Sequence, residues 1–238
     1  MAKHSHSITQ QYGRLDDDRV HAVVRSERIG LTHILRPEIN LAVWQRDVPA
    51  AISTWLSRFD GEDLPTQSHD IDRPLRIEDV AATLLSELRG NDPAAERGVA
   101  ALAHDAKELA QFFAQLSGSS TVRLRLDWVT EQQCPRIHAD RVSMRLLCTY
   151  RGPGTEWIAN DVALPSPDVQ PPESLLHRFG TGDVAIMKGL LDDGCASPLR
   201  HRSPPLKCSA EWRLLLTLDP VSSQSADSSA SIQDVRKG

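Results

Sequence analysis

The sequence lacks a long apolar run and lacks an excess of positive charge. No stretch approaches the roughly 18 apolar residues of a membrane-spanning helix, and the N-terminal segment MAKHSHSITQQYG is polar where a signal peptide has an apolar centre. With 27 Lys and Arg against 32 Asp and Glu, the net charge is −5, which leaves no basic field for nucleic acid or anionic lipid. We therefore predict a cytoplasmic protein without a membrane or nucleic-acid partner.

Cysteine is also scarce and scattered. The four cysteines, Cys134, Cys148, Cys195 and Cys208, form no CxxC pair, which gives no support to a zinc ribbon or a thioredoxin-like motif. In a reducing compartment such cysteines most often serve as small buried hydrophobes. Cys134 lies four residues before His138, so it is an alternative metal ligand there. We expect it to pack in the core instead.

The first half of the chain predicts helices. Residues 15–118 contain stretches in which apolar side chains recur every three or four positions. These stretches are residues 47–59, 77–90 and 92–118. Each has one apolar stripe that must pack on another layer, most simply a sheet. The two ends of the chain, residues 1–14 and 220–238, are polar, and the second is rich in serine, so we predict flexible tails there.

The second half predicts strands. Residues 121–129, TVRLRLDWV, alternate strictly between apolar and polar side chains, which places the two sets on opposite faces of a strand. Further short apolar runs predict strands at residues 142–150, 182–189 and 211–219. Because no helical pattern separates these strands, they should pair antiparallel in a sandwich or barrel. We predict an α+β fold, with a helical N-terminal layer packed on a β core at residues 119–219.

A His-x-Asp pair and a distant histidine form a candidate metal site. His138 and Asp140 are two positions apart, so on an extended segment their side chains point to the same side. With His201 from another strand they would supply two imidazoles and one carboxylate. That set binds one face of an octahedral ferrous ion and leaves the opposite face open. The alternatives are a polar turn capped by Asp140, or a structural scaffold in which the three residues lie apart.

The order of these residues resembles a known superfamily. A His-x-Asp pair, the run GDVAIMKG, the segment HRSPP and then Arg213 follow one another in a way similar to the iron(II)/2-oxoglutarate-dependent dioxygenases. More narrowly, HADRVSMRLLCTYRGPGTEW and RLLLTLD resemble a bacterial family known only as domain of unknown function 1826. The wider resemblance implies a double-stranded β-helix, or jelly roll. It also implies Fe(II), or alternatively zinc, on His138, Asp140 and His201, and 2-oxoglutarate with its far carboxylate on Arg213.

The alternation along the last predicted strand is a second indication that Arg213 faces a ligand. Alternation along residues 211–219 puts Arg213 opposite the apolar stripe of that strand. The stripe should face the helical layer, so Arg213 should point into the barrel, where a guanidinium is costly unless an anion meets it. The alternative is an ion pair with Glu211 or Asp219 near the surface.

Other cations compete for these roles. Arg200, Arg202 and Lys188 lie close enough in the pattern to be rival partners of the co-substrate anion. Arg123 and Arg125 either line a pocket for an anionic substrate or form a solvated strand face.

The sequence thus predicts a non-haem iron(II)- and 2-oxoglutarate-dependent oxygenase. Its substrate is unknown and is either a small molecule or a protein side chain. The alternative is a non-catalytic metal-binding jelly roll that stores, senses or delivers zinc or iron. A closed site completed by Cys134 would favour this alternative, because a structural zinc site has no open position.

Overall fold

A computed structural model describes residues 21–59, 70–88, 93–166, 169–194, 197–208 and 210–221. The predicted N-terminal tail and all but the first two residues of the predicted C-terminal tail lie outside these ranges, as do Cys195 and the start of the helix predicted at residue 92. Within the described ranges, no helix combines the length and apolarity needed to cross a bilayer. The cytoplasmic location stays a prediction.

The helices and strands follow the predicted order with additions. The helices are α1 (Ala50–Leu56), α2 (Val80–Glu87) and α3 (Pro93–Ser117), with short 3-10 turns at Arg28–Leu35, Ile77–Asp79 and Glu173–Leu175. The strands are β1 (Ala22–Arg25), β2 (Leu41–Trp44), β3 (Ile71–Arg76), β4 (Thr121–Val129), β5 (Met144–Arg151), β6 (Glu156–Ile158), β7 (His177–Arg178), β8 (Val184–Lys188), β9 (Arg200–Arg202) and β10 (Arg213–Pro220). The four strands predicted in the second half correspond to β4, β5, β8 and β10.

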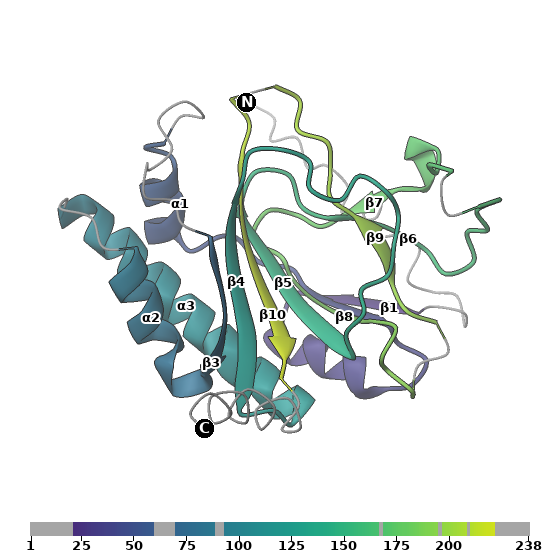
Figure 1. The fold of residues 1–238 in the computed structure, drawn as a ribbon, viewed down its shortest axis with the longest axis horizontal. Coiled ribbons are helices and arrows are strands. Elements are labelled where there is room, and N and C mark those ends of the chain that lie inside the picture. The colour runs from purple at the N-terminus through teal and green to yellow at the C-terminus, as the bar shows by residue number, and fades with distance from the viewer. Residues whose placement is uncertain are drawn as a thin grey trace, which may run out of the picture.

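Two facing sheets form the β core. The large sheet has the strand order β1-β2-β8-β5-β10-β4-β3, and the small sheet has the order β7-β6-β9. Along the chain, β4 lies in the large sheet, His138 then bridges to β9 of the small one, and β5 returns to the large sheet. Strands β6 and β7 are in the small sheet, β8 in the large, β9 in the small and β10 in the large. This alternation confirms the predicted double-stranded β-helix, and Figure 1 shows the helices on the far side of the large sheet.

The first half of the chain also contributes strands, which the prediction of a mainly helical region did not include. Strands β1 and β2 extend one edge of the large sheet and pair in parallel, and β3 forms the other edge. Strands of four residues are too short to show a period of two. Strand β3 is mostly exposed and contains Pro74, a residue that a sheet tolerates at its edge.

The apolar stripes of the strands pack on the helices, as the alternation predicted. The buried residues shared between the two layers are Val122, Leu124 and Leu126 of β4, Leu214, Leu216 and Leu218 of β10, and Leu102, Ala106, Leu109 and Phe113 of α3. Because these side chains face the helices, every second residue of β4 and β10 must face the small sheet. That inner face holds the polar residues of the candidate site.

A half-buried histidine, His21, connects the start of the described chain to the segment after β6 of the small sheet. The Nδ1 atom of His21 lies 2.6 Å from Oδ1 of Asn40, and the backbone N–H of Asn160 donates to Nε2 of His21 at 3.0 Å. The ring must therefore be neutral, since a proton on Nε2 would face that N–H. Burial lowers the pKa of His21 below its usual 6.5, against the raising effect of Asn40.

This arrangement predicts acid-sensitive stability. Because the folded pKa of His21 is below the unfolded one, its contribution is complete above about pH 6.5 and is lost as the pH falls below that value. His21→Gln cannot titrate, so the difference between its free energy of unfolding and that of the wild type should shrink from pH 8 to pH 5. Urea unfolding at both pH values measures this. A difference that is independent of pH would contradict the assignment.

Candidate metal centre

The two sequence-predicted histidines lie side by side because the backbone pairs them. The N–H of His138 donates to the carbonyl of His201 at 2.9 Å, and the N–H of His201 donates back to the carbonyl of His138 at 2.8 Å. Because the backbones pair, the two imidazole rings also lie close together, with centroids 4.6 Å apart. The backbone pairing thus holds His138, in the loop between β4 and β5, beside His201 of β9.

The third predicted ligand completes the group. Nε2 of His201 lies 3.1 Å from Oδ2 of Asp140, and Nε2 of His138 lies 3.7 Å from Oδ1 of Asp140. One ligand atom from each of the three residues lies within 4.8 Å of the other two. Donor atoms that bind one ion at about 2.0 to 2.2 Å lie roughly 3 to 4 Å apart, so only a small movement of His138 is needed.

Both rings are oriented for metal binding. The Nδ1 atom of His138 lies 2.9 Å from the carbonyl oxygen of Arg136, and Nδ1 of His201 lies 3.4 Å from that of Leu199. A carbonyl oxygen accepts only from a protonated nitrogen, so each Nδ1 carries a proton. Each Nε2 faces Asp140 and would bind a metal once the proton that it donates to Asp140 has left. This is the orientation that outer-shell carbonyls give to metal-binding histidines.

The electrostatics of the group keep its carboxylate ionised. Burial opposes ionisation of Asp140, but hydrogen bonds from His138 and His201 and the charges of His201 and Arg145 together hold its pKa well below the usual range. The hydrogen bond to Asp140 also raises the pKa of His138. Asp140 is therefore anionic over the whole physiological pH range, as a carboxylate ligand of a metal would have to be.

Two residues that the sequence did not single out hold Asp140 in place. An Nη1 atom of Arg145 lies 2.5 Å from Oδ2 of Asp140, and the same guanidinium donates to both oxygens of Asp219 at 2.6 and 2.7 Å. Arg125 lies 3.4 Å from Asp219 on its other side. Asp219 thus balances the charge of Arg145, which can contact the ligand without cancelling its negative charge.

We expect Asp219→Asn to weaken metal binding even though Asp219 does not contact the metal group. Without its counter-charge, Arg145 repels the ion and binds Asp140 more tightly. Changes in outer-shell partners cost on the order of 10- to 100-fold in metal affinity, and we expect a loss in that range. Asp72→Asn is the matched control, because Asp72 also pairs with an arginine, Arg123. Competitive chelator titrations of both variants measure the effect, and equal losses would contradict it.

Arg213 is buried and has no ion-pair partner among the described residues. It is 1% exposed, and its guanidinium donates only to the hydroxyl groups of Thr155 at 3.2 Å and Thr149 at 3.4 Å. Burial and the charge of Arg178 lower its pKa to about 10, while Asp127 and Glu156 oppose this from a longer distance. The surface ion pair considered as an alternative does not form: Glu211 accepts from the backbone N–H of Lys207, and Asp219 is bound by Arg145 and Arg125.

The rival cations are engaged elsewhere. Arg200 donates to the carbonyl oxygens of residues 159, 160 and 162. Arg202 donates to Glu156 and Gln170, and Lys188 donates to the carbonyl oxygen of Arg36. Arg213 thus differs from these three cations, because it is buried with only hydroxyl partners among the described residues.

Cys134 neither joins the metal group nor packs in the core. Its side chain is exposed, and the group of converging ligand atoms consists of His138, Asp140 and His201. The expectation that Cys134 is a core residue was wrong, because the loop that carries it lies on the rim of the site. Among the described residues, Cys134 lines the cavity beside the group but does not join the converging ligand atoms.

A cavity of about 180 Å³ lies beside the three ligands. Its walls include Arg125, Asp127, Arg145, Leu147, Thr155, Met187, Leu215 and Thr217. Through Thr155 the cavity reaches the hydrogen bond to Arg213. Burial raises the pKa of Asp127 to about 6. The donor set fits a divalent metal, and Arg213 lies behind Thr155 of the cavity wall.

Comparisons with known proteins give a family and several likenesses in structure. The model of a family described as "Protein of unknown function (DUF1826)" matches residues 26–219. No curated protein matches the chain.

Solved structures resemble the fold. A dioxygenase for auxin oxidation from Arabidopsis thaliana, in a 2-oxoglutarate complex, has a TM-score of 0.47 and 12% identity, covering 85% of this chain and 92% of that one. The rice auxin-oxidation dioxygenase has a TM-score of 0.45 and 13% identity, with coverages of 85% and 83%. A Pseudomonas putida prolyl-4-hydroxylase has a TM-score of 0.42 and 11% identity, with coverages of 83% and 100%. At these values none of them assigns a function to the chain.

Proposed function

The chain belongs to the DUF1826 family, whose name carries no activity, and we propose from its metal centre that it is an iron(II)- and 2-oxoglutarate-dependent oxygenase. One observation carries this proposal. A two-histidine, one-carboxylate group shares a cavity with the hydroxyl group of Thr155. That hydroxyl group contacts a buried arginine that has no ion-pair partner in the described part of the chain. A carrier of metal needs the first feature but has no use for the second.

The chemistry comes from the bound groups. Once held there, ferrous iron and 2-oxoglutarate supply the oxidising power: 2-oxoglutarate loses CO₂ and becomes succinate, while one atom of O₂ enters succinate and the other enters a C–H bond of the substrate. Two imidazoles and one carboxylate leave the remaining metal positions open for such ligands.

The residues of this chain supply position and charge. His138, Asp140 and His201 would hold the metal. Arg213 would grip the far carboxylate of 2-oxoglutarate with Thr149 and Thr155 beside it, which gives the buried guanidinium the anion that it lacks. The apolar walls at Leu147, Met187 and Leu215 would limit access of water around the co-substrate.

The direct test is turnover. Protein purified without oxygen and loaded with Fe(II) should bind 2-oxoglutarate and, on exposure to oxygen, release succinate and CO₂ in equal amounts. Slow release is expected even without the substrate. Metal that binds tightly without any binding or decarboxylation of 2-oxoglutarate would favour the alternative, a non-catalytic protein that stores, senses or delivers zinc or iron.

A further inference from the structure

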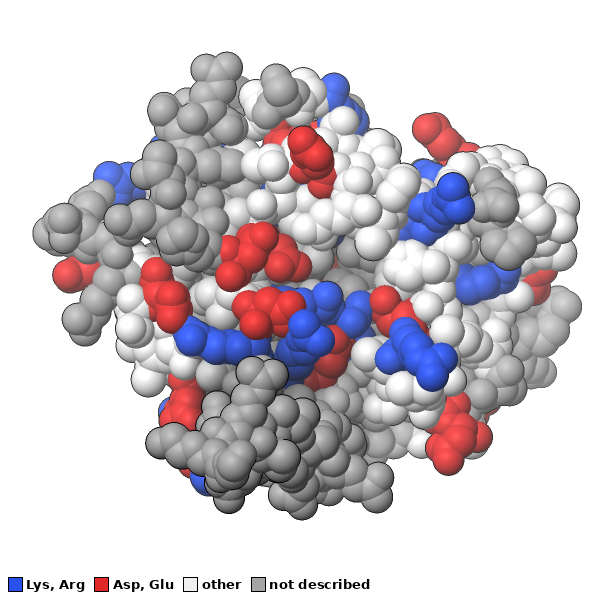
Figure 2. Space-filling model, viewed as in Figure 1, with Lys and Arg blue, Asp and Glu red and all other residues white. Residues whose placement is uncertain are grey.

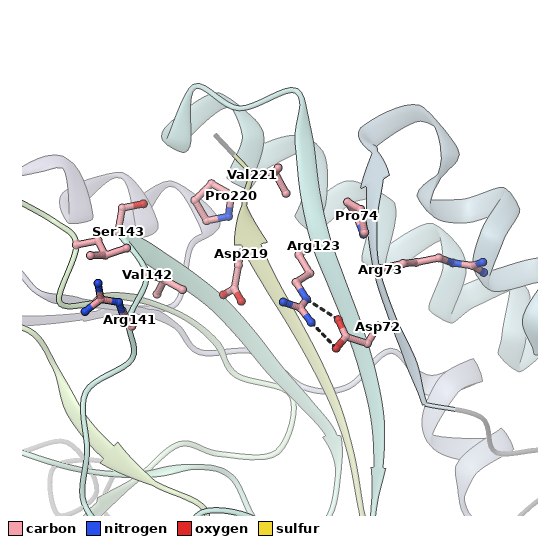
Figure 3. A pocket seen from close by; sticks show the side chains of 11 residues that line it. Asp72, Arg73, Pro74, Arg123, Arg141, Val142, Ser143, Asp219, Pro220 and Val221 are labelled. Carbon is pink, nitrogen blue, oxygen red and sulfur yellow. Dashed lines mark hydrogen bonds and ion pairs between the residues drawn. The ribbon is translucent and has the colours of Figure 1, made fainter. Parts of the chain in front are cut away.

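A second and larger depression lies beside the metal cavity. It has a volume of about 600 Å³, within the range of small-molecule sites. Figure 3 shows Arg141 and Val142 on one side of this groove, the Asp72–Arg123 pair on the other, and Asp219 between them. The groove thus crosses the inner face of β10, β4 and β3, in front of the segment that leads into β5.

The groove and the cavity are lined by neighbouring residues of one segment. Asp140 lines the cavity and its neighbour Arg141 lines the groove. Along β10 the inward residues run from Arg213, next to the cavity, to Asp219 in the wall of the groove. Asp219 binds Arg145, and Arg145 contacts Asp140. A molecule in the groove therefore lies next to the metal, on the side away from Arg213.

Almost all charges of the groove are already paired. Arg123 donates to both oxygens of Asp72 at 2.6 and 2.8 Å, and Arg73 pairs with Glu87. Figure 2 shows basic and acidic side chains interspersed in a band across this face of the molecule. Arg141 is the exception: its side chain is exposed, and it forms no hydrogen bond or ion pair with any residue in the described ranges. It leaves the groove with one uncompensated positive charge.

The remainder of the lining is largely apolar. Pro74, Val142, Leu191, Pro220 and Val221 contribute to the walls. Leu191 is 53% exposed. The backbone of its turn is nevertheless hydrogen-bonded to the segment after Asp140, because the N–H of Leu191 donates to the carbonyl of Val142 at 3.0 Å. An exposed leucine held in a fixed turn at a groove is a surface that an apolar ligand can cover.

We propose that this groove binds the substrate of the oxygenase, and that the substrate is an organic acid with an apolar body. The acidic group pairs with Arg141 and the apolar body lies against Leu191 and Val142, which presents its C–H bonds to the metal beside Asp140. The inference rests on the proposed function for the reaction, but the binding site can be tested without turnover.

The experiment uses the full chain loaded with Zn(II), which does not turn over. Octanoate is titrated by calorimetry, with and without 2-oxoglutarate, and octanamide serves as its neutral counterpart. Wild type should bind octanoate roughly tenfold more tightly than octanamide, the effect of one charged contact of about 1.4 kcal/mol. Arg141→Met should remove this preference and leave octanamide unchanged, whereas Leu191→Ser should weaken both ligands.

Arg25→Met is the matched control, because Arg25 is exposed on β1 at the opposite edge of the large sheet. It should bind both ligands as the wild type does. The proposal is overturned if wild type does not bind octanoate, if it binds octanamide equally well, or if Arg141→Met keeps the preference. A wild type that binds octanoate as expected but never binds 2-oxoglutarate would instead refute the proposed function and leave the groove as an acid-binding site.

Discussion

Arg213→Met is expected to leave the metal bound and to weaken 2-oxoglutarate binding by about 2 to 4 kcal/mol, the cost of losing one partner of a buried charged pair. That corresponds to roughly 30- to 1,000-fold in affinity. Methionine keeps the volume of the side chain and removes the charge. Because the guanidinium is 1% exposed without an ion pair, the variant without ligands should be at least as stable as the wild type.

Three measurements separate this role from a structural one. Metal affinity, 2-oxoglutarate affinity and urea unfolding are compared for Arg213→Met and for Arg151→Met. Arg151 lies on the neighbouring strand β5 and packs over the ring of Trp212, on the helix side of the sheet. Its variant should bind 2-oxoglutarate normally. If Arg213→Met unfolds more easily while its affinity for 2-oxoglutarate is unchanged, Arg213 is a structural residue.

His201→Ala should abolish most metal binding. Removing one of three ligands should cost at least on the order of 100-fold, the upper end of the losses that changes in outer-shell partners cause. The fold should survive, since the pairing with His138 uses backbone atoms and is unaffected by the substitution. Binding of 2-oxoglutarate should fall with the metal, because the acid would lose its second anchor.

His177→Ala is the control for this variant. His177 is on β7 of the same small sheet and stacks on Trp157 with ring centroids 4.4 Å apart, but it is not one of the three converging residues. Anaerobic titration against a coloured chelator should therefore give wild-type metal affinity for His177→Ala. Normal affinity in His201→Ala would show that the metal, if bound, lies elsewhere.

The local patterns of the sequence were sufficient for much of the fold. Strict alternation in β4 identified both faces of that strand, and the stripe along α3 identified its buried side. These features depend on the backbone periods of strand and helix, which are the same in every protein. The short strands β1 and β2 and the edge strand β3 were missed, because their place depends on pairing with strands far along the chain.

The sequence also predicted the candidate ligands. His138, Asp140 and His201 supply two imidazoles and one carboxylate, in the order of a His-x-Asp pair followed by a distant histidine. Arg213 could be placed on the inner face from alternation alone. The structure brings the first three to one cavity and places Arg213 behind Thr155 of its wall, so these four residues are the part of the candidate site that the sequence predicted.

Only the tertiary structure decided what the other charged residues do. Arg145 and Asp219 are 74 positions apart, and nothing local to either predicts that they meet behind Asp140. Likewise the sequence offered Arg200 as a rival partner of the co-substrate and did not single out Arg141. In the structure, Arg200 is held by carbonyl oxygens, and Arg141 lines the groove with no partner among the described residues. The physical reason is that the type of a residue fixes its charge, whereas the energy of that charge depends on neighbours that only the folded chain brings within a few ångströms.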